Sequence, residues 1–137
     1  MSTLSYVCIV THDNGLRNLL EQIFIIRGDP IVIVRTLQDA EIAIERWDSA
    51  TCRLVIIDTA ALGRCETEQK HTACRILEDW TTTYPTLPFV FLGTLLQKYA
   101  LLAIRADIMR FIVKPFRLDD LIDAIEDFCP LISCQTG

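Results

Sequence analysis

Two residues that could do chemistry together each follow a short apolar run of the sequence. Asp58 ends the run LVIID, and Lys114 directly follows the run FIV. If both runs are buried parallel strands, their carboxyl ends bring a carboxylate and an ammonium group to the same edge of a sheet. Such a pair is either a structural ion pair or part of a site that binds an anion.

Further polar residues follow two other apolar runs. The run VCIV leads into Thr11, His12 and Asp13, of which only the last is acidic. The run FVFL leads into Gly93 and Thr94. Binding sites of doubly wound sheets lie at the carboxyl ends of the strands, so all these residues are candidates for one site.

The composition limits the class of protein. The chain has 137 residues, of which 51% are hydrophobic, enough for one domain with a full core. Its formal net charge of −5 argues against nucleic acid as a partner. No apolar run is long enough to cross a membrane, and the N-terminus does not look like a signal peptide. We therefore expect a cytoplasmic protein without a membrane partner.

The cysteines are expected to be free thiols, because disulfides are rare in a reducing compartment. There are six of them: Cys8, Cys52, Cys65, Cys74, Cys129 and Cys134. A metal site made of Cys65, His71 and Cys74 is an alternative for part of this set. It has no evident fourth ligand, so we do not expect it.

Two hydrophobic periods alternate along the chain and predict five strand–helix units. The expected strands are residues 5–10, 31–35, 54–57, 89–92 and 111–113. The first helix is capped by Asp13 or Asn14 and ends near Gly28; the others start after Thr36 and cover about 66–81, 95–105 and 118–128. Right-handed crossovers make this an α/β fold, a five-stranded parallel sheet that is doubly wound, (βα)5, as in flavodoxin. We expect a single domain over 1–137, with its core at about 4–129 and a C-terminal tail at 130–137.

The motifs LVIID and KPF, in register with five strand–helix units, resemble the receiver domain of response regulators, the CheY-like family. The resemblance spans about residues 4–129. It implies that Asp58 accepts a phosphoryl group in a two-component phosphorelay and that Lys114 contacts the phosphate. It also implies a cis peptide bond before Pro115 and a switch role for the ring of Phe111. The implied partner is a histidine kinase or another signalling protein.

The chain departs from the family at the metal site. Receivers hold Mg²⁺ with the phosphoacceptor and two adjacent carboxylates after the first strand, and these two places fall on Thr11 and His12. Mg²⁺ prefers oxygen ligands, whereas imidazole suits Zn²⁺ or Cu²⁺ better. Asp13 could replace the missing acids only if the turn adjusts. We expect Mg²⁺ to be held weakly by Asp58 and Asp13, or not at all, and no other cofactor.

Two further positions carry open alternatives. Gly93 stands where the family has a phosphate-binding Ser or Thr, and the hydroxyl of Thr94 is displaced by one residue. His12 is either a pH-sensitive partner of the nearby carboxylates or a solvated histidine of the turn.

The expected fourth helix has apolar residues around nearly its whole circumference, which indicates a covered surface. The residues concerned are Leu95, Tyr99, Leu101, Leu102 and Ile104. With the fifth strand and fifth helix they form the usual partner surface of receivers, so a homodimer or a docking face is expected there. The alternative is that some are core residues and the others are scattered exposed ones.

The functional expectation is therefore a receiver-like signalling module with a degenerate metal site, which signals through protein contacts with impaired or no phosphorylation. The first alternative is a conventional receiver that is phosphorylated on Asp58 by a histidine kinase. The second is a small flavodoxin-like binding module outside any phosphorelay. We do not expect an enzyme, because the sequence has no G-x-G-x-x-G loop, no P-loop and no evident nucleophile.

Overall fold

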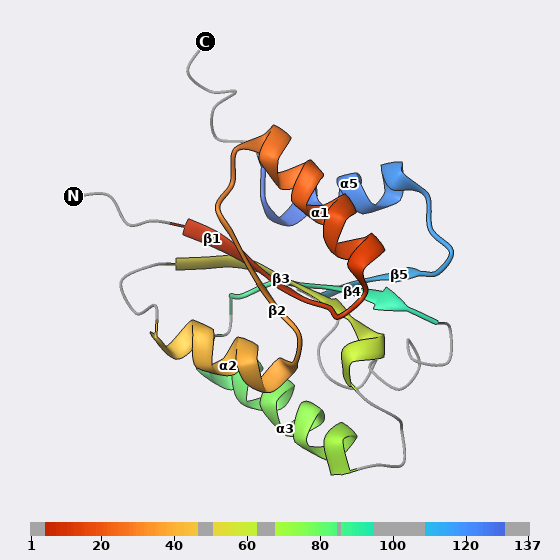
Figure 1. The fold of residues 1–137 in the computed structure, drawn as a ribbon. Coiled ribbons are helices and arrows are strands. Elements are labelled where there is room, and N and C mark those ends of the chain that lie inside the picture. Colours follow the sequence, from red (N-terminus) through yellow and green to blue (C-terminus); the bar gives the residue numbers. More distant parts are fainter. Residues whose placement is uncertain (1–4, 47–50, 63–67, 85, 95–108, 131–137) are drawn as a thin grey trace, which may run out of the picture.

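A computed structural model of the chain describes residues 5–46, 51–62, 68–84, 86–94 and 109–130. The strands are β1 (Ser5–Val10), β2 (Ile31–Val34), β3 (Thr51–Asp58), β4 (Phe89–Gly93) and β5 (Met109–Val113). The helices are α1 (Asn14–Arg27), α2 (Leu37–Arg46), α3 (Glu68–Thr83) and α5 (Leu118–Phe128), with a 3-10 turn, η1 (Thr59–Leu62). All strand pairs are parallel, and the order is β2-β1-β3-β4-β5 (Figure 1). The expected α/β fold with a five-stranded parallel sheet is confirmed.

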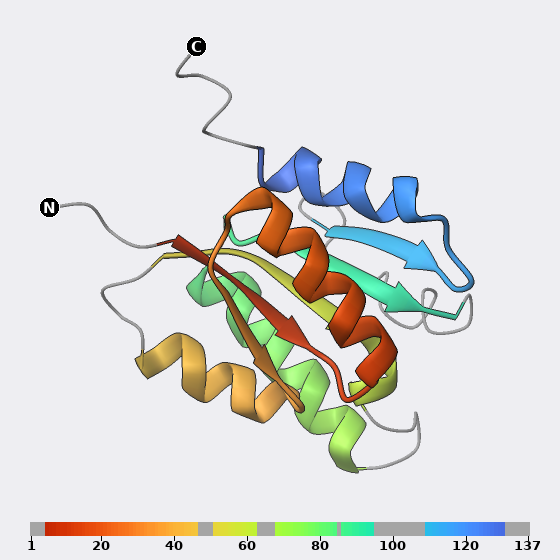
Figure 2. The same ribbon diagram turned by 45° about the horizontal axis from the view of Figure 1, so that its top comes forward.

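Helices cover both faces of the sheet. α1 and α5 lie on one face, and α2 and α3 lie on the other (Figure 2). β1 illustrates why the chain folds this way, because successive side chains of a strand point to opposite faces. Val7 and Ile9 pack into the core under α1 and α5, whereas Cys8 and Val10 pack into the core under α2 and α3. A strand that is buried on both faces needs a continuous apolar sequence, which VCIV provides.

Most element boundaries agree with the expectation from the sequence. β1 and α5 have the expected ends, and β2 is one residue shorter than expected. β3 is longer at its start, at residues 51–53, because it continues past an irregularity in its pairing with β1. β5 also starts earlier, at Met109, because this residue pairs with Phe89. The expected fourth helix lies outside the described residues.

A partly buried ion cluster ties the amino edge of the sheet together. The register of β1 and β3 passes from Tyr6↔Cys52 to Val7↔Leu54, so Arg53 is the extra residue of a bulge. The Arg53 guanidinium binds Asp29 Oδ1 at 3.0 Å, and the Arg27 Nε binds Asp29 Oδ2 at 2.8 Å. These two arginines also donate to the backbone oxygens of Pro130 and Cys129, respectively. The cluster therefore links α1, β2, β3 and the end of α5.

The cysteines whose side chains the structure describes are free thiols, as expected. They are Cys8, Cys52 and Cys129. Burial raises the pKa of Cys8 to about 12 and that of Cys52 to about 11, because the thiolate would lose its hydration. Thiols with such pKa values are poor nucleophiles near neutral pH.

Within the part of the chain that the structure describes, there is no helix with the length and apolar character needed to span a membrane.

Candidate functional site

Asp58 ends β3 at the carboxyl edge of the sheet and is almost completely buried, with 1% of its surface exposed. Both of its carboxylate oxygens have partners. Oδ1 accepts a hydrogen bond from Lys114 Nζ at 2.8 Å and another from the backbone N–H of Ala60 at 3.2 Å. Oδ2 accepts one from Thr11 Oγ1 at 3.0 Å. The buried charge is thus compensated within the chain, as a buried carboxylate must be.

Thr11 reaches Asp58 because β1 and β3 are neighbouring strands in register. Val10 pairs with Ile57, so the residues that follow them lie side by side. Thr11 is buried, with 2% of its surface exposed. Its hydroxyl donates to Asp58 and at the same time accepts from the backbone N–H of Asp13 at 3.1 Å. Thr11 therefore occupies the space beside Asp58 where the resemblance places a carboxylate.

Asp13 has a structural task at the start of α1. Its backbone is extended, and its Oδ1 accepts from the backbone N–H groups of Gly15 at 2.8 Å and Leu16 at 3.1 Å. This is the N-cap arrangement, which satisfies amide groups that have no partner inside the helix. The carboxylate is therefore directed to the helix end, and redirecting it toward Asp58 would expose two unpaired amides.

Lys114 comes directly after β5 and is placed by the backbone on both sides. Its N–H donates to the carbonyl oxygen of Gly93 at 2.7 Å, which continues the pairing of β4 with β5. The peptide bond between Lys114 and Pro115 is cis, as the resemblance implied. The Lys114 side chain is 33% exposed, so its ammonium group bridges the buried carboxylate and the solvent.

The donors at this edge do not fit a Mg²⁺ ion. Mg²⁺ needs near-octahedral oxygen ligation and is usually held through carboxylates. Here Asp58 is engaged by an ammonium and a hydroxyl group, and Asp13 is engaged by the end of α1. His12 is exposed and offers a nitrogen ligand. Among the described residues, no group of three or more His, Cys, Asp and Glu side chains is placed to hold a metal ion.

The remaining predicted site residues are only partly brought together. Gly93 is buried at the end of β4, and Thr94 is exposed beyond it. The residues expected at the partner surface, which are Leu95, Tyr99, Leu101, Leu102 and Ile104, lie outside the described residues. So do Cys65 and the side chains of His71 and Cys74.

Phe111 belongs to a row of stacked aromatic rings on the α2 and α3 face of the sheet. The neighbouring ring centroids are 6.1 Å apart for Trp80 and Phe89, 6.1 Å for Phe89 and Phe91, and 6.2 Å for Phe91 and Phe111. Such stacking adds to the energy of apolar burial. The row connects β5 to α3, and the switch role of Phe111 stays a prediction.

One contact and one residue of the site were missed by reasoning from the sequence. Thr11 was considered only as a lost acid, although its register with Asp58 would have predicted the hydroxyl–carboxylate contact. Thr59 was not considered at all. It is buried next to Asp58, and its hydroxyl donates to the carbonyl oxygen of Leu92 at 3.1 Å. This bond joins the end of β3 to the end of β4, and a Thr directly after a strand-ending Asp is its only signal in the sequence.

Comparison with known proteins shows which fold class the chain belongs to. No family model and no curated protein matches the sequence. The structure is similar to a putative response regulator from Chloroflexus aurantiacus, with a TM-score of 0.69, 19% identity and coverage of 93% of this chain and 98% of the other. It is similar to a CheY-like receiver domain protein from Methanospirillum hungatei (TM-score 0.65, 20% identity, 92% and 93% covered). It is also similar to NtrX from Brucella abortus, with a TM-score of 0.67 and 25% identity. The match covers 93% of this chain and 27% of NtrX. The chain has the fold of response-regulator receiver domains.

Proposed function

We propose that the chain is a receiver-like module of a two-component signalling system that acts through protein contacts without depending on phosphorylation. The observation that carries this proposal is the hydrogen bond from Thr11 to Asp58. Transfer of a phosphoryl group to a carboxylate depends on positioning and on cations that neutralise the developing charge. The proposal is supported by the burial of this carboxylate and its pairing with Lys114, and by the lack, among the described residues, of a group of three or more His, Cys, Asp and Glu side chains that could hold a metal ion.

The proposed role is one of binding rather than catalysis. A partner would be a histidine kinase or another signalling protein, and it would read the conformation of the module. The surface that we assign to it comprises the segment at 95–105, β5 and α5. A homodimer through this surface is the alternative to docking of a different protein. Sedimentation at micromolar concentration tests it, with Leu101→Glu as the control. If the homodimer forms, the wild-type chain sediments as a dimer and the variant as a monomer. A wild-type chain that sediments as a monomer, like the variant, would contradict it.

The phosphorylation part has a direct test. The chain is incubated with acetyl phosphate or beryllofluoride, with and without Mg²⁺, and followed by intact mass and by amide spectra. We expect no stoichiometric adduct and no Mg²⁺-dependent change in the spectra. An adduct that requires Mg²⁺ and is lost in Asp58→Asn would overturn the proposal.

A conventionally phosphorylated receiver is the second candidate. It is favoured by the 2.8 Å contact between Lys114 Nζ and Asp58 Oδ1 and by the cis bond before Pro115. A phosphorylated chain would have to release Asp58 from Thr11 first, because both carboxylate oxygens are engaged. The same mass measurement distinguishes the two candidates.

A further inference from the structure

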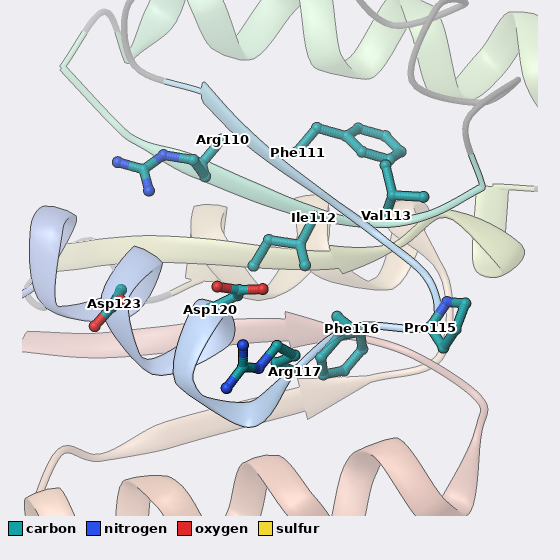
Figure 3. A pocket seen from close by; sticks show the side chains of 9 residues that line it. All are labelled: Arg110, Phe111, Ile112, Val113, Pro115, Phe116, Arg117, Asp120 and Asp123. Carbon is teal, nitrogen blue, oxygen red and sulfur yellow. The ribbon is translucent and has the colours of Figure 1, made fainter.

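A groove of about 560 Å³ runs beside β5, an edge strand of the sheet (Figure 3). Residues 110–113 of this strand line it, together with Pro115, Phe116 and residues from the start of α5. Successive side chains of a strand point to opposite faces of the sheet. A groove that is bordered by four consecutive strand residues therefore follows the edge of the strand rather than one of its faces.

The backbone of β5 presents hydrogen-bonding groups along this edge. The N–H of Lys114 points to β4, because it donates to Gly93. Backbone groups of successive strand residues point alternately to the two sides, so those of Met109, Phe111 and Val113 point away from β4. No described residue pairs with them, since β5 has β4 as its one neighbour in the described sheet. As far as the described residues extend, this edge has room for a further strand.

The α5 side of the groove carries an excess of negative charge. Asp120 and Asp123 line it from exposed positions on α5, with Arg117 as the nearby cation (Figure 3). Arg110, on the β5 side of the groove and toward its Asp123 end (Figure 3), forms an ion pair with Asp127 and lies over the ring of Phe128. Two carboxylates therefore face the groove against one guanidinium group that has no ion pair among the described residues.

We propose that this groove binds an extended segment of a partner protein, which pairs with the edge of β5 that faces away from β4 and directs basic side chains toward Asp120 and Asp123. The main chain of the segment supplies the affinity and its alternate side chains supply the specificity, as in other cases of strand addition. On its other face the segment would cover Val113, an exposed apolar residue of β5. This inference deepens the proposed docking function by naming the chemistry of the partner.

The test uses a blocked hexapeptide of alternating valine and lysine as the probe. Amide hydrogen exchange is measured on the whole chain with and without the peptide. At a peptide concentration about ten times its Kd, exchange at Met109, Phe111 and Val113 should slow about tenfold. Arg110 and Ile112, whose amides point to β4, are internal controls and should change little. Unchanged exchange at all three outward amides with millimolar peptide would overturn the proposal.

Two N-methylated peptides separate strand pairing from nonspecific attraction. One is methylated on every valine and the other on every lysine, so in one of them the amides that face β5 are all blocked. We expect one peptide to lose binding and the other to retain it. Equal binding of the two would show that no strand is added. The same amides of β5 can also be measured at increasing concentration of the chain without peptide. If their exchange slows, the occupant of the groove is a second copy of the chain, which contradicts the assignment to a different protein.

The charge requirement is tested with Asp120→Asn and Asp123→Asn. Each should weaken binding of the valine–lysine peptide about two- to fivefold, the range for exposed charge pairs. Asp119→Asn is the matched control, because Asp119 is exposed in the same helical turn but does not line the groove. An unchanged Kd in both test variants would contradict the assigned basic partner. None of these measurements involves Asp58, so their failure would be separate from a failure of the phosphorylation proposal.

Discussion

A hydroxyl and a carboxylate at position 11 would have opposite effects on the negative charge of Asp58. The hydroxyl of Thr11 donates a hydrogen bond to the buried carboxylate and stabilises its charge. A second carboxylate in the same place would repel it and would need a cation to neutralise both. The residue at position 11 therefore adds to the stabilisation that Lys114 and the Ala60 N–H give to the Asp58 carboxylate.

The first prediction concerns Thr11→Val, which keeps the shape of the side chain and removes the hydroxyl group. The variant leaves Asp58 Oδ2 without its donor in a buried position, so the free energy of unfolding should fall by about 1 to 3 kcal/mol. Urea unfolding followed by circular dichroism measures it. Thr11→Ser is the control and should keep most of the stability; a wild-type midpoint for Thr11→Val would contradict the role of the hydroxyl.

The second prediction is that the double variant Thr11→Asp/His12→Asp gains dependence on Mg²⁺. Without the ion, the added charges beside Asp58 should lower the melting temperature. With the ion present, binding to the folded state alone should raise it again by mass action. Thermal unfolding with MgCl₂ or with EDTA measures the difference, which should be absent in the wild-type chain. Adding Asp58→Asn to the variant should weaken the response; an equal response would place the ion elsewhere.

At the level of elements, α1 depends on a residue that the metal site would compete for. Asp13 satisfies two amide groups at the start of α1, and Gly28 ends the helix with a positive φ of 83° and an N–H bond to Phe24. Left-handed backbone of this kind favours glycine. Both ends of α1 were evident in the sequence, as a polar turn before Leu16 and a Gly followed closely by Pro30. The competition between capping and metal binding was evident only from the geometry.

The third prediction is that Asp13→Ala lowers the free energy of unfolding by about 1 kcal/mol, the typical cost of losing an N-cap. The reason is that the amides of Gly15 and Leu16 lose their acceptor. Chemical unfolding measures the loss. Asp13→Asn is the matched control, because its side-chain oxygen can still cap. If alanine and asparagine were equally tolerated, the cap would contribute nothing.

At the scale of the whole molecule, burial on both faces of the sheet shields the central strands from solvent. Cys8 in β1 and Cys52 in β3 are held in the protonated state by this burial. Their pKa values of about 12 and about 11 lie above the ordinary value of 9.0. Between these values the unfolded chain loses its thiol protons while the folded chain keeps them, so rising pH favours unfolding.

The fourth prediction follows from that sign. The contribution of the two thiols is complete below pH 9 and is lost as the pH rises toward 11 and 12. The free energy of unfolding in reducing buffer should therefore fall by about 1 to 3 kcal/mol from pH 8 to pH 10. In Cys8→Ala/Cys52→Ala the decrease should be smaller; an identical pH profile would show that these thiols do not cause it.

The fold was predictable and the site only in part, for physical reasons. Runs such as VCIV and LVII can be buried on both faces only inside a parallel sheet, so their alternation with helical periods leaves few folds. The meeting of Asp58 with Lys114 follows from the same topology. The sequence does not predict which groups hydrogen-bond to the Asp58 carboxylate. These partners depend on the rotamers of Thr11 and Asp13 and on which of several acceptors each donor selects.

β3 is fastened at both of its ends, by Arg53 to Asp29 at one and by Asp58 to Lys114 and Thr11 at the other. Because β3 has polar contacts at both ends, sliding of the strand along its axis is opposed, whereas tilting or bending can keep these contacts. Axial displacement by a single residue would break contacts at both anchors simultaneously. A displacement of β3 along its own axis is therefore opposed at both edges of the sheet at once.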